Sequence, residues 1–61
     1  SLKSREYKIC ILVKLGLQNS DIATVMCRKA NTITYSRANI YKKLLGKEGT
    51  AKDFDKFIKS L

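Results

Sequence analysis

Proline, histidine and tryptophan are absent from this 61-residue sequence. The lack of proline, together with 44% hydrophobic residues, favours a globular all-α chain. Without histidine, the usual zinc-ligand sets and the commonest general base are missing. The longest apolar run, residues 9–13, is far shorter than the ~20 residues that span a bilayer. We therefore expect residues 1–61 to have no metal site, no cofactor and no contact with a membrane.

Acidic residues are also few, and their positions do not suggest catalysis. The acids stand at expected helix starts or on solvent faces, where capping and the helix dipole account for Glu6, Asp21 and Asp53. A chain this short has no core large enough to shift a pKa in a pocket. We expect no enzymatic activity. The acids are Glu6, Asp21, Glu48, Asp53 and Asp55.

Positive charge is what the sequence has in excess. Lys and Arg number 13 against 5 Asp and Glu, which gives a net charge of +8 and a pI near 9.8. This balance points to nucleic acid, or less strongly to an anionic membrane surface.

We expect residues 1–61 to form a single domain. Because the chain opens on Ser1 rather than Met, we expect it to be a piece of a longer protein, either excised or preceded by a tag remnant.

The charge is concentrated in residues 22–47, which contain no acid. Inside this stretch the apolar spacing predicts a helix over residues 31–44, and about 30–45 at its widest, with an inward stripe at i, i+4, i+7 and i+11. Such a helix fits the major groove of DNA. The stripe is Ile33, Arg37, Ile40 and Leu44, and the opposite face carries Asn31, Thr34, Tyr35, Ala38 and Lys42.

Two shorter amphipathic segments precede this helix. The first is expected to start near residue 4 with Ser4 as its cap, and to end at Gly16. The second is expected to begin after Asn19 or Ser20 and to be only about two turns long. The predicted inward residues are Ile9, Cys10, Leu12, Val13 and Leu17 in the first segment and Ile22, Ala23 and Met26 in the second.

A fourth helix is predicted after Gly46. Thr50 and Asp53 have the spacing of a capping box. Apolar residues then recur at helical spacing at Ala51, Phe54, Phe57, Ile58 and Leu61. Phe54 and Phe57 are expected to close the core. Ile58 and Leu61 are candidates for a dimer surface, because two-fold DNA sites are usually read by dimers.

The ordered set of residues from 2 to 44 resembles the LuxR/GerE-type helix-turn-helix, in which these places hold L-T-x-R-E, G-L-x-N-x-E-I-A, T-V and I-x-x-K-L. The resemblance implies a four-helix bundle of the winged-helix-like superfamily, whose third helix enters the major groove. It also implies a cytoplasmic bacterial transcription regulator with this domain at its C-terminus. The matching residues are Leu2, Arg5, Glu6, Ile9, Cys10, Gly16, Leu17, Asn19, Ile22, Ala23, Met26, Thr32, Ile33, Ile40 and Leu44.

The sequence departs from the family pattern at the turn before the third helix. Cys27 stands where the family often has Gly, and Lys29 stands where it has a Ser or Thr cap, so we expect Asn31 to cap this helix. Ala38 stands where Lys is common, so the family's base contacts do not transfer.

The two cysteines could pair by count alone, but an intracellular DNA-binding domain keeps its thiols reduced, and we expect both to be free.

These patterns give a set of candidate contacts with double-stranded DNA. Bases would be read by Asn31, Thr34, Tyr35 and Ala38. Phosphates would be held by Asn19, Ser20, Arg28, Lys29, Lys42 and Lys43. Arg37 falls on the inward stripe, where an unpaired guanidinium would be costly, so we expect it to pair with Glu6 and tie the helix to the scaffold.

Three alternatives to a DNA-reading regulator remain. The basic helix could be solvated without any nucleic-acid partner. The chain could be a protein-interaction module that uses the helix of residues 54–61 and leaves its basic face idle. It could also be a promoter-recognition domain like that of a sigma factor, which shares the same helical pattern and still binds DNA.

Overall fold

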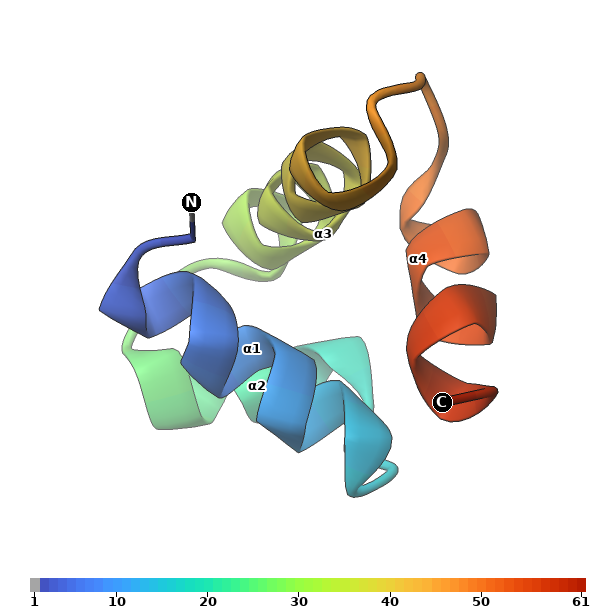
Figure 1. Ribbon diagram of the computed structural model, residues 1–61. Helices are drawn as coiled ribbons and strands as arrows, with labels where there is room; N and C mark the ends of the chain where they lie inside the picture. The colour runs from blue at the N-terminus through green and yellow to red at the C-terminus, as the bar shows by residue number, and fades with distance from the viewer. Residues whose placement is uncertain (1) are drawn as a thin grey trace.

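The computed structural model describes residues 2–61, which form four helices and no strand (Figure 1). The helices are α1 (Ser4–Lys14), α2 (Asn19–Met26), α3 (Ala30–Leu45) and α4 (Ala51–Lys59). The predicted all-α class is therefore confirmed. A three-residue turn, residues 27–29, joins α2 to the longest helix, α3.

Left-handed residues end the first three helices. Gly16 (φ 93°) and Gly46 (φ 69°) do so after α1 and α3, as predicted. Cys27 (φ 56°) ends α2, where the Arg28 N–H donates to the carbonyl of Ala23 at 2.9 Å and the Cys27 N–H to that of Thr24 at 3.2 Å. This is a Schellman motif, which usually carries Gly at the left-handed position. The departure from Gly therefore leaves the turn geometry in place.

Three predicted N-caps are wrong by one or two residues. Lys3, Gln18 and Lys29 occupy the N-cap positions of α1, α2 and α3, and none of them makes a side-chain capping bond. At α1 only the second bond of a capping box is made by a side chain, because the Glu6 carboxylate accepts the Lys3 backbone N–H at 2.7 Å. The predicted caps Ser4, Asn19, Ser20 and Asn31 lie inside the helices.

The capping box of α4 is confirmed. The Asp53 N–H donates to the Thr50 hydroxyl at 3.2 Å, and the Thr50 N–H donates to the Asp53 carboxylate at 2.9 Å. Both residues are exposed, so this pair acts locally to start the helix.

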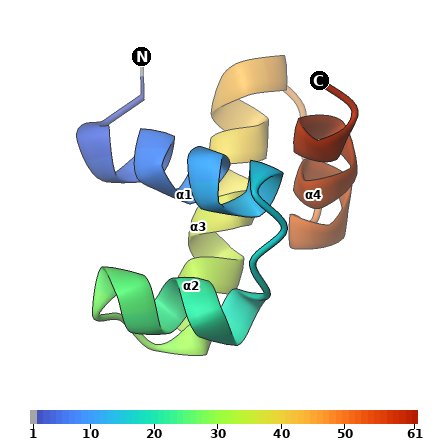
Figure 2. The same cartoon turned by 90° about the horizontal axis from the view of Figure 1, so that it is seen from below.

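The hydrophobic core lies where α3 packs against the other three helices, of which α1 and α2 lie below it and α4 to its right in Figure 1, and all four are seen from below in Figure 2. The predicted inward positions of α1, α2 and α4 supply most of it. Ala23 is buried, as expected for a close approach of α2 to α3. The buried apolar residues are Ile9, Val13, Ile22, Ala23, Ile33, Ile40, Tyr41, Phe54 and Ile58, and Cys10, Leu12, Leu17, Met26 and Phe57 pack against them.

One residue of the predicted inward stripe of α3 is wrong. Leu44 is 43% exposed, and Tyr41 is buried in its place, with its ring edge-to-face on Phe57 at 6.4 Å between centroids. Leu44 lies in the last turn of α3, which projects past α1 in Figure 2. A periodic pattern cannot show that its partner helices stop short of the last turn.

Both cysteines are free in the structure. Cys10 is half-buried and Cys27 is exposed. Burial raises the pKa of the Cys10 thiol. No helix among residues 2–61 has the length and apolar character needed to cross a bilayer.

Candidate nucleic-acid interface

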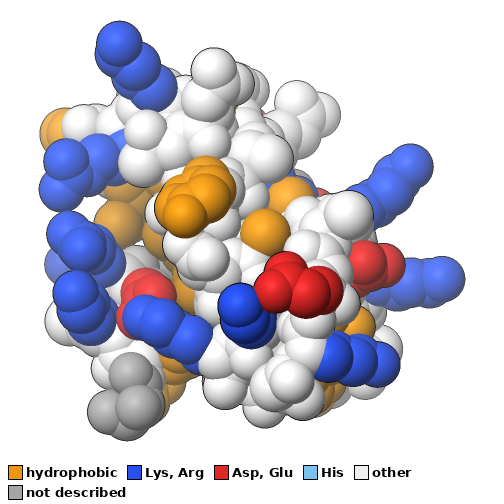
Figure 3. All heavy atoms as spheres, turned by 90° about the horizontal axis from the view of Figure 1, so that it is seen from above, with side chains coloured by type: hydrophobic (Ala, Val, Ile, Leu, Met, Phe, Trp, Pro, Cys, Tyr) orange, Lys and Arg blue, Asp and Glu red, His pale blue; other side chains and the backbone are white. Residues whose placement is uncertain are grey.

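The predicted base-reading residues form one outer edge of α3. Asn31, Thr34 and Tyr35 are exposed, Tyr35 to 71%, and Ala38 is half-buried. The Thr34 hydroxyl donates to the Ala30 carbonyl of the same helix at 3.2 Å, so its oxygen remains able to accept. Figure 3 shows the face of the molecule on which α3 lies, with Lys and Arg side chains spread around its rim.

The predicted phosphate contacts divide into two groups. Ser20, Arg28 and Lys29 are exposed, and no ion pair of the described residues involves the two cations. Lys42 pairs with Glu48 at 2.9 Å on the surface, and Lys43 pairs with Glu6 at 2.8 Å. Arg28 and Lys29 therefore offer their full positive charge, whereas Lys42 and Lys43 each have an acid beside them.

Asn19, also predicted to hold a phosphate, is occupied by structural bonds. Its side-chain amide donates to the Ala30 carbonyl at 3.0 Å, and its side-chain oxygen accepts from Arg37 Nη1 at 2.6 Å. The side chain is half-buried between the start of α2 and α3. We therefore remove Asn19 from the phosphate contacts and describe it as a residue that fixes α2 against α3.

The predicted pairing of Arg37 with Glu6 is wrong. Both residues are buried, each 8% exposed, but Arg37 turns towards α4 and pairs with Asp55, with its Nε 3.0 Å from Oδ1. Glu6 lies on the α1 flank of α3, next to Lys43. Each buried charge thus has its own partner, and no buried polar side-chain atom among residues 2–61 lacks a hydrogen bond.

The Glu6 carboxylate has two donors. The Lys3 backbone N–H lies 2.7 Å away and Lys43 Nζ 2.8 Å away. The backbone hydrogen bond first, and then the bond from the Lys43 ammonium, lower the pKa of Glu6 below its ordinary value. Glu6 is therefore held as a carboxylate and joins the start of α1 to the last turns of α3.

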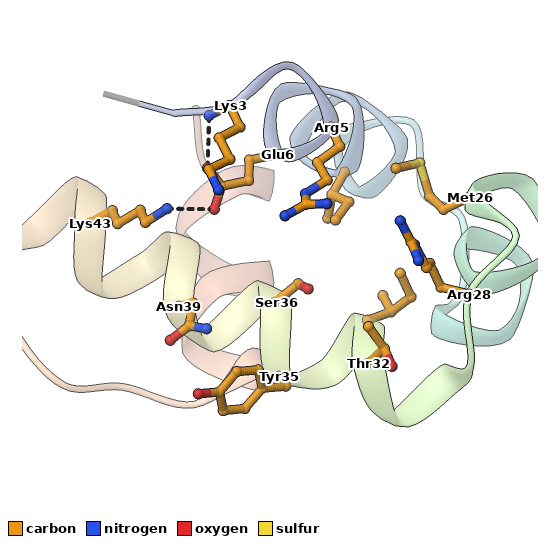
Figure 4. Close-up of a pocket in the computed structure, with 12 residues that line it drawn as sticks. Lys3, Arg5, Glu6, Met26, Arg28, Thr32, Tyr35, Ser36, Asn39 and Lys43 are labelled. Atoms are coloured by element: carbon orange, nitrogen blue, oxygen red, sulfur yellow. Dashed lines mark hydrogen bonds and ion pairs between the residues drawn. The ribbon is translucent and has the colours of Figure 1, made fainter.

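A groove of about 390 Å³ runs between the start of α1, the turn after α2 and one flank of α3 (Figure 4). Arg5 and Arg28 reach into it from opposite sides, above Thr32 and Ser36 of α3. Asn39 and Tyr35 also line it. Neither this groove nor a role for Arg5 in it was predicted from the sequence, although the spacing of Thr32, Ser36, Asn39 and Lys43 marks a polar flank of α3.

The predicted dimer surface on α4 is half wrong. Ile58 is 4% exposed and belongs to the core of the single chain, so it offers nothing to a second copy. Leu61 is 71% exposed and follows the end of α4. Lys14 Nζ donates to the carbonyls of Lys59, at 3.3 Å, and Leu61, which ties this end of the chain to α1.

Comparison of the chain with protein-family models, with curated proteins and with solved structures gave no match. Within residues 2–61, no three His, Cys, Asp or Glu side chains gather as a metal-binding group.

Proposed function

We propose that this protein is a sequence-specific DNA-binding domain, with α2 and α3 forming a helix-turn-helix and α3 entering the major groove. The observation that carries the proposal is the outer edge of α3, where exposed hydrogen-bonding side chains stand beside Arg28 and Lys29, which form no ion pair with another residue of 2–61. The opposite side of α3 is anchored in the core. A helix held in this way can present its edge to base pairs without unfolding.

The resemblance to LuxR/GerE-type domains supports a more specific form of the proposal. Three features agree with it: four helices in the order that this type uses, a three-residue turn before α3, and a left-handed residue in that turn. We propose a cytoplasmic transcription regulator of bacterial origin as the whole protein. Double-stranded DNA is its partner, read by Asn31, Thr34, Tyr35 and Ala38 and held at its phosphates by Ser20, Arg28, Lys29, Lys42 and Lys43.

Binding to mixed-sequence duplex at several salt concentrations tests the proposal. Each neutralised phosphate contributes about −0.9 to the slope of log K against log salt, so contacts from the four cations Arg28, Lys29, Lys42 and Lys43 predict a slope of about −3.6. Selection of preferred duplexes from a random pool then tests sequence specificity. An enriched motif is expected, and a palindromic motif would report binding by two copies. Salt-independent binding, or no enrichment, would contradict sequence-specific DNA binding.

A protein-interaction module is the second candidate, and one observation favours it. Tyr7 and Ile11 of α1 form an exposed apolar stripe with Leu15, which directly follows the helix. Val25 of α2 lies across a shallow apolar groove from Ile11. The helix of residues 54–61, which the sequence suggested for such an interaction, is largely buried, because Phe54 and Ile58 belong to the core. Failure to bind any duplex, at low as well as moderate salt, would favour this candidate.

A further inference from the structure

Two arginines from different elements converge on one space. Arg5 comes from the first turn of α1 and Arg28 from the turn after α2, and Figure 4 shows both guanidinium groups pointing into the groove above α3. The ion pairs of residues 2–61 join Arg37 to Asp55, Lys42 to Glu48 and Lys43 to Glu6. Arg5 and Arg28 thus face each other without a carboxylate partner among these residues.

The acidic residue in the groove does not neutralise them. Glu6 accepts the Lys3 backbone N–H and pairs with Lys43, so its charge is already balanced. Two guanidinium groups across a groove repel each other, and an anion placed between them turns this repulsion into attraction. The groove therefore offers two exposed positive charges to an anion.

The backbone at Arg28 is held in place. Its N–H donates to the Ala23 carbonyl at 2.9 Å as the last bond of the Schellman motif. Arg5 lies in a helical turn whose start is closed by Glu6. Both arginine stems thus leave fixed backbone, which lowers the entropy lost when their forks bind an anion.

The floor of the groove is polar and belongs to α3. Thr32, Ser36 and Asn39 line it with two hydroxyls and an amide. Guanidinium forks with hydroxyl and amide donors are the groups that hold phosphate oxygens along nucleic-acid backbones. Tyr35 lines the same groove and also stands on the outer edge of α3, so the groove and that edge are continuous.

We propose that the Arg5–Arg28 groove binds the phosphodiester backbone of one strand of the duplex that α3 reads. This inference rests on the proposed function. A helix with its side chains is about 10–12 Å wide and the major groove is about 12 Å wide, so a strand backbone runs close beside each flank of an inserted helix. The groove lies along one such flank. Arg5, Thr32, Ser36 and Asn39 join the phosphate contacts, and Arg28 contacts the same strand as Arg5.

Charge removal at matched sites tests this assignment. The variants are Arg5→Gln and Arg28→Gln, with Lys52→Gln on exposed α4 as the control. All three sites are exposed, so the core is not disturbed, and thermal unfolding checks this. We expect each arginine variant to bind duplex DNA about tenfold more weakly near 0.1 M salt and to lose about 0.9 from the salt slope. Lys52→Gln is expected to leave both quantities near the parent values.

Arg5→Lys and Arg28→Lys separate fork geometry from charge. Lysine keeps the positive charge, so the salt slope should stay, while affinity falls because the bidentate contact is lost. Duplexes with a single neutral methylphosphonate then locate the contact. One or two adjacent positions should weaken binding of the parent chain and have no effect on the Arg5→Gln, Arg28→Gln double variant.

The outcomes distinguish this inference from the proposed function. If the parent chain binds duplex with a steep salt slope, and the arginine variants behave like Lys52→Gln, the groove assignment is wrong and DNA binding stands. If inorganic phosphate shifts the amide resonances around Arg5 and Arg28 of the parent chain, while the arginine variants bind duplex like Lys52→Gln, the groove is a site for a free phosphate instead. If the parent chain binds no duplex, both proposals fail.

Discussion

Arg37 and Asp55 form an ion pair that fastens α3 to α4, with Arg37 Nε 3.0 Å from Asp55 Oδ1. The same guanidinium donates to Asn19 at the start of α2, at 2.6 Å. One buried side chain therefore connects three helices. The orientation of α3, and with it the direction of its outer edge, depends on this connection.

Asp55→Ala is expected to destabilise the domain by about 3 kcal/mol, because it leaves the buried Arg37 guanidinium without its carboxylate. Urea unfolding followed by circular dichroism measures the loss. Glu48→Ala is the matched control, since it breaks the exposed pair with Lys42 and should cost less than about 0.5 kcal/mol. Equal losses of unfolding free energy in the two variants would show that the buried pair stabilises the domain no more than the exposed pair does.

The stability of the domain is expected to fall at acid pH in part through Glu6. Its hydrogen bonds lower the pKa of Glu6 in the folded state. Its contribution to the free energy of unfolding is therefore complete above the pKa of the unfolded chain, about 4.3, and is lost as the pH falls through the pKa of the folded state. The Thr50 hydrogen bonds lower the pKa of Asp53 as well, and act in the same direction.

Glu6→Gln should therefore reduce the difference between the unfolding free energies measured near pH 7 and near pH 3, without abolishing it. Urea midpoints at a series of pH values provide the measurement. Glu48→Gln removes an exposed negative charge and serves as the control. If the urea midpoint of Glu6→Gln falls with pH as steeply as that of the parent chain, Glu6 does not contribute to the loss of stability in acid.

Cys27→Gly is expected to stabilise the domain. A left-handed non-glycine residue costs roughly 1–2 kcal/mol, and the extra backbone entropy of glycine offsets about 0.5–1 kcal/mol of the gain. Thermal unfolding should show a Tm several degrees higher. Cys27→Ala removes the same thiol but keeps the strained φ, so it should bring no gain. A higher Tm in both variants would attribute the effect to the thiol.

Tyr35→Ala and Lys42→Ala are expected to weaken DNA binding in different ways. Removal of the exposed Tyr35 ring should cost about 1–3 kcal/mol on the preferred duplex and blur selection at one base position. Lys42→Ala should weaken binding to all sequences alike and reduce the salt slope by about 1. Titrations with preferred and scrambled duplexes provide the measurement. Equal losses on both duplexes for Tyr35→Ala would contradict base reading from this edge of α3.

The local features of the fold were predictable from the sequence. Gly16 and Gly46 end helices because they tolerate positive φ, and Thr50 with Asp53 starts one because both groups bond within a single turn. Such signals depend on neighbouring residues alone. The displaced N-caps show the limit of this approach, since Asn19 is drawn into long-range bonds with Ala30 and Arg37 instead of capping its own helix.

The positions of side chains at the helix interfaces were less predictable. Leu44 and Tyr41 both fall near the inward arc of α3, and the placement of the neighbouring helices decided which one is buried. The burial of Ile58 was not predictable for a similar reason. A periodic pattern shows that a residue lies on the apolar face of a helix, but it does not show whether that face packs on the core or on a second copy.

By itself, the sequence determined the helical class, the helix boundaries at Gly16, Gly46 and Thr50 and the excess of positive charge, because these follow from local conformational preferences and composition. Only the tertiary structure decided that Arg37 meets Asp55 rather than Glu6, and that Arg5 and Arg28 face each other over α3. The sequence alone does not show which acid on one helix pairs with which arginine on another. Their pairing depends on how the helices pack around a shared core.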